Sequence, residues 1–446
     1  MSYLIRNARI VNEGKNFEGD LLIKNGIIEK VDTSLNPNFK VTEILAEGKY
    51  LIPGVIDDQV HFREPGLTHK AEIATESIAA VIGGTTSFME MPNTSPPATT
   101  AKLLEEKYAI ASACSPANYS FYFGASNENI EETLRISTEN VCGLKVFMGS
   151  STGNMLVDDS KTLEAIFSKW PGLIATHCED EAIIRANTEK AIRDYREDIP
   201  FHMHPEIRSV DACLKSSSKA VELAKKWGAR LHVLHISTED ETFLFDNSLA
   251  LEKKRITAEA CVHHLWFDSS YYEESGARIK CNPAIKSKKH QQGVWAALKS
   301  GRIDVVATDH APHTIEEKEN PYLSAPSGLP LVQHSLLMML EYVDKGEISI
   351  EQLVQWMSHN PAIAFRLKDR GFIKEGFAAD LVLVDSMHKT MVKKNSLHYK
   401  CNWSPLEGYT FSNSIDKVFV NGNLIVENGR LVSAAKGARL LFEKER

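Results

Sequence analysis

The chain has 446 residues, of which 43% are hydrophobic and 25% are charged, and its net charge at pH 7 is −8. This composition is typical of a globular protein with enough chain for one large domain and a smaller one. No basic patch suits nucleic acid and no run approaches the ~18 apolar residues of a membrane span, so we expect neither kind of partner. The seven cysteines lack paired spacing, which favours reduced thiols and a cytoplasmic location.

Both ends of the chain carry short strand-like runs separated by turns. Residues 1–52 contain YLIRNARIV and GDLLIKNGIIEKV, and residues 366–446 contain AADLVLVD and DKVFVNGNLIVENGRLV. The pairs Asn25-Gly26 and Asn421-Gly422 stand between such runs, which is a strong hairpin signal. Because the middle of the chain lacks this pattern, we predict that the two ends join into one small β-sandwich domain.

Residues 53–365 alternate apolar strand-like runs with helical patterns. The eight runs are IPGVIDDQVHF, TTSFMEMPN, NYSFYFGAS, GLKVFMG, GLIATHCED, RLHVLHIST, RITAEACVHHL and DVVATDHAPH. Segments such as AEIATESIAAVIGG and SKAVELAKKWGA between them have helical periodicity. Eight strands alternating with helices predict an α/β fold, a (β/α)₈ TIM barrel, with a doubly wound sheet as the alternative.

Polar side chains follow the apolar residues in five of these runs. They are His61 and Arg63, Asn93, His177, His235, and Asp309 and His313. Because the carboxyl ends of barrel strands meet at one mouth, residues far apart in sequence become neighbours there. Imidazole and carboxylate groups suit Zn²⁺ and similar ions, so this set predicts a metal site. Each residue taken alone is also compatible with a structural role.

Two charged residues stand in or directly after buried runs. Asp309 needs a cationic partner, or its pKa rises until it is protonated. Lys145, inside CGLKVFMG, has its pKa depressed by burial, and the neutral amine can add CO₂ to give a carbamate whose two oxygens bridge two metals. A salt-bridged or snorkelling lysine is the alternative.

The motifs of the chain, taken in order, resemble the dihydroorotase branch of the amidohydrolase superfamily, in its class I-like form. They are IPGVIDDQVHFREPG, GGTT with MPNT, GLKVF, THCE, VLHIST, TAEACVHHL, KCNPAIKS, ATDHAPHTIEEK and EGFAADLVLVD. The resemblance spans nearly the whole chain and implies the barrel with a composite β domain. It also implies reversible cyclisation of N-carbamoyl-L-aspartate to L-dihydroorotate and water in pyrimidine synthesis.

The resemblance further implies zinc, with one or two ions per subunit. Carried over by position, the first ion is held by the residues at Gln59, His61, Lys145 and Asp309, and the second by Lys145, His177 and His235. Lys145 is carbamylated in the relatives that this chain resembles. In the mechanism that the resemblance implies, the ions would supply the hydroxide that attacks the ring carbonyl, and Asp309 would be the general base and then acid.

Substrate contacts also follow from the resemblance and from side-chain chemistry. Dihydroorotate carries a carboxylate, which Arg63 binds bidentately while Asn93 and His313 add hydrogen bonds. The resemblance places Asn282 on the ring amide and the backbone around Pro326 and Gly328 near the substrate. Hydantoinases and allantoinases share the scaffold but act on substrates without this carboxylate, so Arg63 favours a dihydroorotase.

Residues 148–156, MGSSTGNML, have few apolar anchors and are predicted to be mobile. Similar enzymes close a loop here over the substrate, so a lid with Thr152 as a contact is expected, with a passive surface loop as the alternative. Similar proteins also often form homodimers.

Gln59 departs from the family pattern, which has His-x-His where this chain has Gln59-Val60-His61. An amide oxygen is a weaker ligand than imidazole, so Gln59 either ligates weakly or leaves a single metal. A third reading is an inactive chain that serves as a partner of an aspartate transcarbamoylase. We favour an active enzyme because His61, Arg63 and Asp309 remain.

Overall fold

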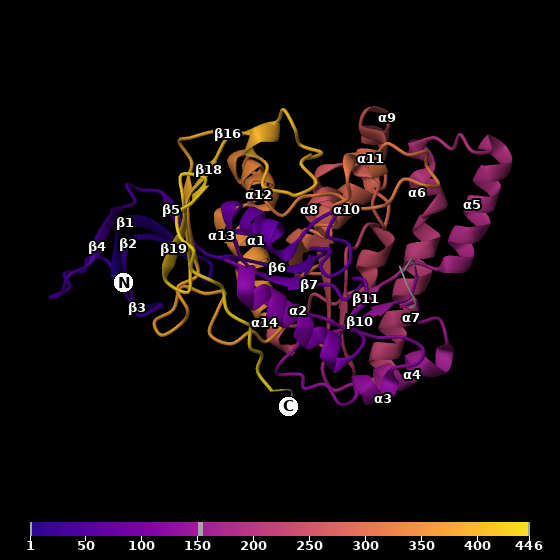
Figure 1. Cartoon of the computed structure of the whole chain (residues 1–446), viewed down its shortest axis with the longest axis horizontal. Helices are drawn as coiled ribbons and strands as arrows, with labels where there is room; N and C mark the ends of the chain where they lie inside the picture. Colours follow the sequence, from indigo (N-terminus) through magenta and orange to yellow (C-terminus); the bar gives the residue numbers. More distant parts are fainter. Residues whose placement is uncertain (1, 150–154, 445–446) are drawn as a thin grey trace.

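The structure is a computed structural model that describes residues 2–149 and 155–444. A β-rich part built from both ends of the chain lies beside a larger part with helices around parallel strands (Figure 1). The predicted lid contact, Thr152, lies outside the described residues.

A nine-stranded sheet joins the two ends of the chain. Its strands are β1 (Ser2–Asn12), β2 (Lys15–Lys24), β3 (Ile27–Asp32), β4 (Thr42–Leu45), β5 (Tyr50–Pro53), β15 (Leu381–Asp385), β18 (Ser414–Val420), β19 (Asn423–Glu427) and β20 (Arg430–Leu431). The two ends meet where β5 pairs antiparallel with β15, so that Leu51 faces Leu383. The predicted composite β unit is confirmed, whereas the domain boundaries stay predictions.

Both predicted hairpins form. Asn25 and Gly26 connect β2 to β3 with φ of 53° and 86°, and Asn421 and Gly422 connect β18 to β19 with φ of 48° and 72°. Two successive left-handed residues match the twist of a two-residue hairpin, and asparagine and glycine adopt this conformation at low cost.

The eight predicted barrel strands are all present. They are β6 (Val55–Val60), β7 (Thr85–Glu90), the broken strand β8 (Asn118–Phe121) and β9 (Phe123–Gly124), β10 (Leu144–Phe147), β11 (Leu173–His177), β12 (Arg230–Val233), β13 (Ile256–Cys261) and β14 (Val305–Ala307). Neighbouring strands pair in parallel and in chain order. A parallel bridge between Val60 and His310 brings the segment after β14 back to β6. This circular order is that of the (β/α)₈ barrel and differs from a doubly wound sheet, in which the order reverses.

The helices follow the strands and cover the outside of the barrel. They are α1 (Ile73–Ile82), α2 (Ala101–Cys114), α3 (Ile130–Thr133), α4 (Ser160–Lys169), α5 (Glu181–Tyr195), α6 (His204–Ile207), α7 (Val210–Trp227), α8 (Val262–Trp266), α9 (Tyr272–Ser275), α10 (Lys288–Lys299), α11 (Ile315–Lys318), α12 (Ser335–Asp344), α13 (Ile350–Val354) and α14 (Asn360–Ala364). Helix α7 shows why they form. The Ser209 side chain caps its first turn, and Gly228 ends it with φ of 64°. One face of the helix, which includes Ala220 and Ala224, is buried.

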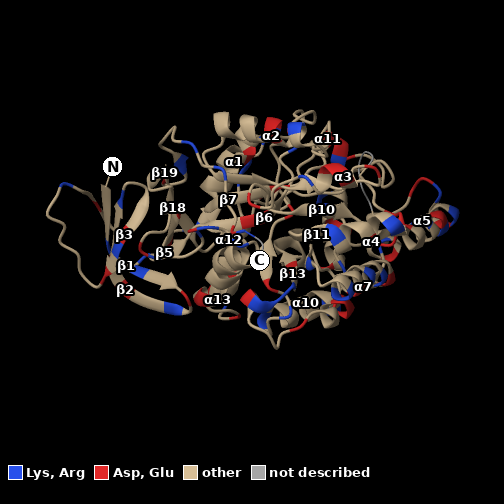
Figure 2. Cartoon of the chain, turned by 90° about the horizontal axis from the view of Figure 1, so that it is seen from below, with Lys and Arg blue, Asp and Glu red and all other residues tan. Residues whose placement is uncertain are grey.

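Acidic and basic residues are interspersed along outer helices such as α5 and α7 (Figure 2). In the described ranges, no helix combines the length and apolar character needed to cross a bilayer.

A buried ion pair links α2 to the end of β7. Lys107 Nζ lies 2.9 Å from Glu90 Oε2 and donates to the Met91 carbonyl at 2.9 Å. The other Glu90 oxygen accepts from the Phe62 N–H at 3.0 Å. The pair therefore fixes the backbone between His61 and Arg63, two predicted site residues.

Replacing Lys107 with methionine should lower the free energy of unfolding by about 3–5 kcal/mol, because Glu90 would stay buried without its cation. Equilibrium urea unfolding measures the change. Lys102→Met on the same helix is the control, since the Lys102 side chain is 86% exposed and its loss should change stability by less than about 0.5 kcal/mol. Equal effects of the two substitutions would contradict this account.

Candidate active site

A cavity of about 260 Å³ lies at the carboxyl ends of the barrel strands. It is lined by Gln59, His61, Arg63, Asn93, Lys145, Phe147, His177, His235, Asn282, Asp309, Ala311, His313, Pro326, Ser327 and Gly328. Every predicted site residue within the described ranges lines it; Thr152 lies outside those ranges. The eight strands bring these residues together because parallel strands in a barrel all end at the same mouth.

Two histidines face each other across one side of the cavity. His177 Nδ1 lies 2.9 Å from His235 Nε2, and His177 Nε2 lies 2.9 Å from Glu179 Oε2. Burial opposes ionisation of Glu179, but Arg208 and His177 overcome it and bring the pKa of the carboxyl to about 2. The charged Glu179 therefore accepts the Nε2–H of His177, which leaves the lone pair of Nδ1 pointing toward His235.

His61 and Asp309 form the opposite side of the cavity. His61 Nδ1 lies 2.8 Å from Asn93 Oδ1, so this nitrogen carries the hydrogen and Nε2 faces Asp309 Oδ1 at 3.1 Å. Burial would raise the pKa of Asp309, but His61, His263 and Lys145 bring it below its usual value. A carboxylate and an imidazole nitrogen thus face the same small volume.

Gln59 is turned so that its amide nitrogen faces Asp309. Its Nε2–H donates to Asp309 Oδ1 at 3.1 Å, and its Oε1 lies 3.6 Å from Cys261 Sγ. In this orientation the side chain offers a hydrogen rather than a ligand oxygen toward Asp309. Rotation of the amide would be needed before Gln59 could ligate an ion there.

Lys145 projects from β10 into the cavity and is buried. In the part of the chain that the structure describes, no carboxylate lies within 4.0 Å of its Nζ, which sits 4.6 Å from the centre of the Phe147 ring. Burial lowers the pKa of Lys145 to about 8. About a tenth of the amine is therefore uncharged and nucleophilic at pH 7.

Arg63 brings a buried positive charge to the cavity. Its Nε donates to the Pro312 carbonyl at 3.1 Å, and its Nη2 lies 3.0 Å from His313 Nε2. Among the described residues, no carboxylate is within 4.0 Å of the guanidinium, although the residue is only 8% exposed. Burial lowers the pKa of Arg63 to about 10. A buried cation in this state calls for an anion from outside the chain.

Three of these residues have left-handed backbones: φ is 69° at Arg63, 40° at His235 and 45° at Asp309. Non-glycine residues adopt this region at a cost, and such conformations cluster at functional sites. The surrounding hydrogen bonds sustain it at His235, whose N–H donates to Glu259 Oε1 at 3.0 Å.

The donor set of the cavity fits a divalent metal ion. Burial lowers the pKa of His61, His177 and His235, which keeps the imidazoles neutral. His235 Nδ1 has no hydrogen-bond partner among the described residues. The other ring nitrogen of His235, Nε2, faces His177 Nδ1 at 2.9 Å. Neutral imidazoles and a carboxylate converging on a small volume suit zinc and related ions.

Several residues that shape the site had no clear signal in the sequence. Glu179 follows His177 by two positions in THCED, which is a weak hint. Arg208 comes from the turn before α7, and nothing in its neighbours marks it. Lys318 lies outside the cavity, yet its Nζ donates to the carbonyls of Pro326 at 2.9 Å and Gly328 at 3.0 Å and so holds that loop.

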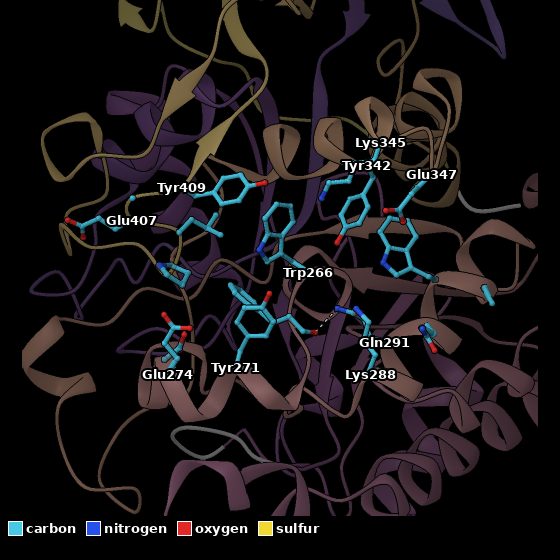
Figure 3. Close-up of a pocket in the computed structure, with 18 of the residues that line it drawn as sticks. Trp266, Tyr271, Glu274, Lys288, Gln291, Tyr342, Lys345, Glu347, Glu407 and Tyr409 are labelled. Carbon is cyan, nitrogen blue, oxygen red and sulfur yellow. Dashed lines mark hydrogen bonds between the residues drawn. The ribbon is translucent and has the colours of Figure 1, made fainter.

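A larger groove of about 970 Å³ lies elsewhere on the surface, among Trp266, Tyr342, Tyr409 and their neighbours (Figure 3). Two tyrosine hydroxyls in this groove are already bonded within the protein. Tyr342 OH donates to the Leu265 carbonyl at 2.9 Å and Tyr409 OH to Glu341 Oε2 at 3.2 Å. The groove lacks the converging imidazoles of the barrel cavity, which remains the candidate active site.

Comparison with known proteins agrees with this geometry. Residues 50–425 match the model of the amidohydrolase family. The chain belongs to the amidohydrolase family. It is 30% identical to a dihydroorotase of Methanosphaera stadtmanae, over 92% of this chain and 93% of that protein. It is 32% identical to a dihydroorotase of Methanosarcina acetivorans, over 91% and 88%.

Solved structures of family members share the fold. The L-hydantoinase of Arthrobacter aurescens superposes with a TM-score of 0.91 at 27% identity, over 97% of each chain. The dihydropyrimidinase of Brevibacillus agri gives 0.89 at 26% identity, over 98% of each chain. The family and these relatives identify the chain as a metal-dependent cyclic amidohydrolase.

Proposed function

We propose that the protein is a dihydroorotase, which interconverts N-carbamoyl-L-aspartate and L-dihydroorotate with loss or gain of water. The observation that carries the proposal is Arg63, a buried guanidinium at the cavity with no carboxylate partner among the described residues. The substrate carboxylate fills that role, since arginine binds carboxylates bidentately. The names of the archaeal relatives support the same activity.

The proposed metal is zinc, one or two ions per subunit. His61, Asp309 and a carbamylated Lys145 hold the first ion, with Gln59 a weak or absent ligand, and Lys145, His177 and His235 hold the second. Bound zinc lowers the pKa of water and polarises a carbonyl.

The chain's own residues position the substrate and move the proton. Asp309, whose pKa lies below its usual value, is ionised at neutral pH. Its carboxylate accepts a proton from the attacking water and returns it to the ring nitrogen as the bond between that nitrogen and the carbonyl carbon breaks. Arg63, Asn93 and His313 hold the substrate carboxylate. Asn282 and the backbone at Pro326 and Gly328 address the ring amide.

Two other functions have some support. The inactive partner of an aspartate transcarbamoylase is favoured by Gln59, whose N–H rather than oxygen faces Asp309. A hydantoinase-like activity is favoured by the solved structures that share the fold, which are those of an L-hydantoinase and a dihydropyrimidinase. We place the active enzyme in pyrimidine biosynthesis in the cytoplasm, with a homodimer as the expected state.

Assays of the zinc-loaded protein in both directions test the activity. We expect turnover of dihydroorotate and carbamoyl aspartate and little of hydantoin, which has no carboxylate. Arg63→Met should lower kcat/KM for dihydroorotate on the order of 100- to 1,000-fold, because a buried charged contact is lost, and should leave zinc content unchanged. Full zinc occupancy without turnover would favour the inactive partner.

Carbamylation of Lys145 should depend on pH. With a pKa of about 8, the uncharged amine rises from roughly 10% at pH 7 to about half at pH 8 and ~90% at pH 9. At constant dissolved CO₂, reactivation of metal-stripped protein should therefore quicken about five-fold from pH 7 to 8 and level off above pH 9. A carbamate signal in ¹³C NMR with labelled bicarbonate, absent in Lys145→Ala, is expected; no such signal would refute it.

Gln59→His should strengthen zinc binding at the first site about ten-fold or more, because imidazole replaces an amide turned away from the ion. Competition with a chelating dye measures the affinity. Gln292→His, on the exposed side of α10, adds a histidine outside the cavity and should have no effect. An unchanged affinity in Gln59→His would count against the ligand assignment.

A further inference from the structure

A second cluster of ligating side chains lies inside the barrel. It comprises Asp58 on β6, His232 on β12 and Glu259 on β13, which we call the core triad. All three residues are 0% exposed, and one ligand atom from each lies within 4.8 Å of the other two. None of them lines the active-site cavity, so the proposed reaction leaves the core triad without a role.

The spacing of the core triad is that of ligands around a shared ion. His232 Nε2 lies 3.2 Å from Asp58 Oδ2 and 3.3 Å from Glu259 Oε2. Bonds of about 2.0–2.2 Å to a tetrahedral zinc ion separate neighbouring ligands by roughly 3.3 Å. A direct charged hydrogen bond would be shorter, at about 2.7–2.9 Å.

The tautomer of His232 also suits metal binding. Its Nδ1 lies 2.7 Å from Thr257 Oγ1, and the Thr257 hydroxyl donates to the Leu231 carbonyl at 3.3 Å. Thr257 is therefore the acceptor for an Nδ1–H of His232, which directs Nε2 at the two carboxylates. Metal-binding histidines are commonly oriented by such a hydrogen bond from the other ring nitrogen.

The carboxylates of the core triad need a positive charge. Apart from His232 Nε2, which lies 3.2 Å from Oδ2, no hydrogen-bond donor in the described part of the chain reaches the carboxylate oxygens of Asp58, despite full burial. Glu259 uses Oε1 to accept from the His235 N–H at 3.0 Å, which leaves Oε2 facing His232. Burial opposes the charged form of His232, but hydrogen bonds to Asp58 and Glu259 raise its pKa to about 9. A divalent cation bound at Nε2 would displace that proton and balance the two carboxylates.

We propose that the core triad binds a divalent transition-metal ion, with zinc as the best match to one imidazole and two carboxylates. The site is structural, because it is closed to solvent and ties together three strands. Asp58 precedes Gln59 in the chain, and Glu259 accepts the His235 N–H. The ion therefore stabilises the backbone of two residues on opposite sides of the cavity. The proposal does not depend on which substrate the enzyme takes.

Diffraction from wild-type crystals grown with zinc tests the site directly. We expect an anomalous peak at the zinc edge between Asp58 Oδ2, His232 Nε2 and Glu259 Oε2, separate from any peak in the cavity. The absence of a peak there, with the cavity occupied, would overturn the proposal and leave a triad held by protons alone.

Zinc counting by mass spectrometry in purified protein gives a second test. His232→Leu should contain one zinc fewer per chain than the wild type. The control is His204→Leu: His204 is equally buried but bonds to the Tyr322 hydroxyl and the Cys281 carbonyl instead of carboxylates, and its zinc content should match the wild type. Equal zinc in His232→Leu and wild type would refute the site, and if that variant fails to fold, the anomalous map decides.

Discussion

A charged group withdrawn from water needs an opposite charge or several hydrogen bonds, and this requirement organises the interior of the barrel. Glu90 and Lys107 neutralise each other in a buried ion pair, and Glu90 also fixes the backbone beside His61. Glu179 and Arg208 form a second ion pair, and Glu179 orients the His177 ring through a hydrogen bond. Arg63 has no carboxylate within 4.0 Å among the described residues, and the Asp309 carboxylate has only the Gln59 amide and the His61 imidazole as hydrogen-bonding partners in the part of the chain that the structure describes. In the proposed function, Arg63 receives the anion of the substrate and Asp309 helps to hold a metal cation.

Much of the fold could be predicted because its determinants are local. The Asn-Gly pairs specify hairpins because both residues adopt left-handed backbone conformations at low cost. The eight apolar runs predict buried parallel strands. The site was predictable to the extent that barrel topology alone brings strand ends together. His61, His177, His235 and Asp309 needed no knowledge of side-chain packing to be grouped, and the family resemblance assigned their partners.

The rest depended on contacts between distant segments. The amide of Gln59 is oriented by Asp309 and Cys261, neither of which is near it in sequence. Arg208 reaches Glu179 from a turn whose sequence is unremarkable. Asp58, His232 and Glu259 sit at ordinary strand positions, and only the closure of the barrel shows that they meet. Local patterns carry no information about such pairings.

The sheet that joins the two ends has a consequence for how the chain is made. Strand β5 leads directly into the first barrel strand, yet its neighbour β15 belongs to the last part of the polypeptide. During translation, the edge of β5 that pairs with β15 stays exposed until β15 has been synthesised. Contacts between such distant segments form slowly, and an open edge meanwhile invites wrong partners. Biogenesis of this enzyme therefore favours assistance from chaperones that shield nascent strands.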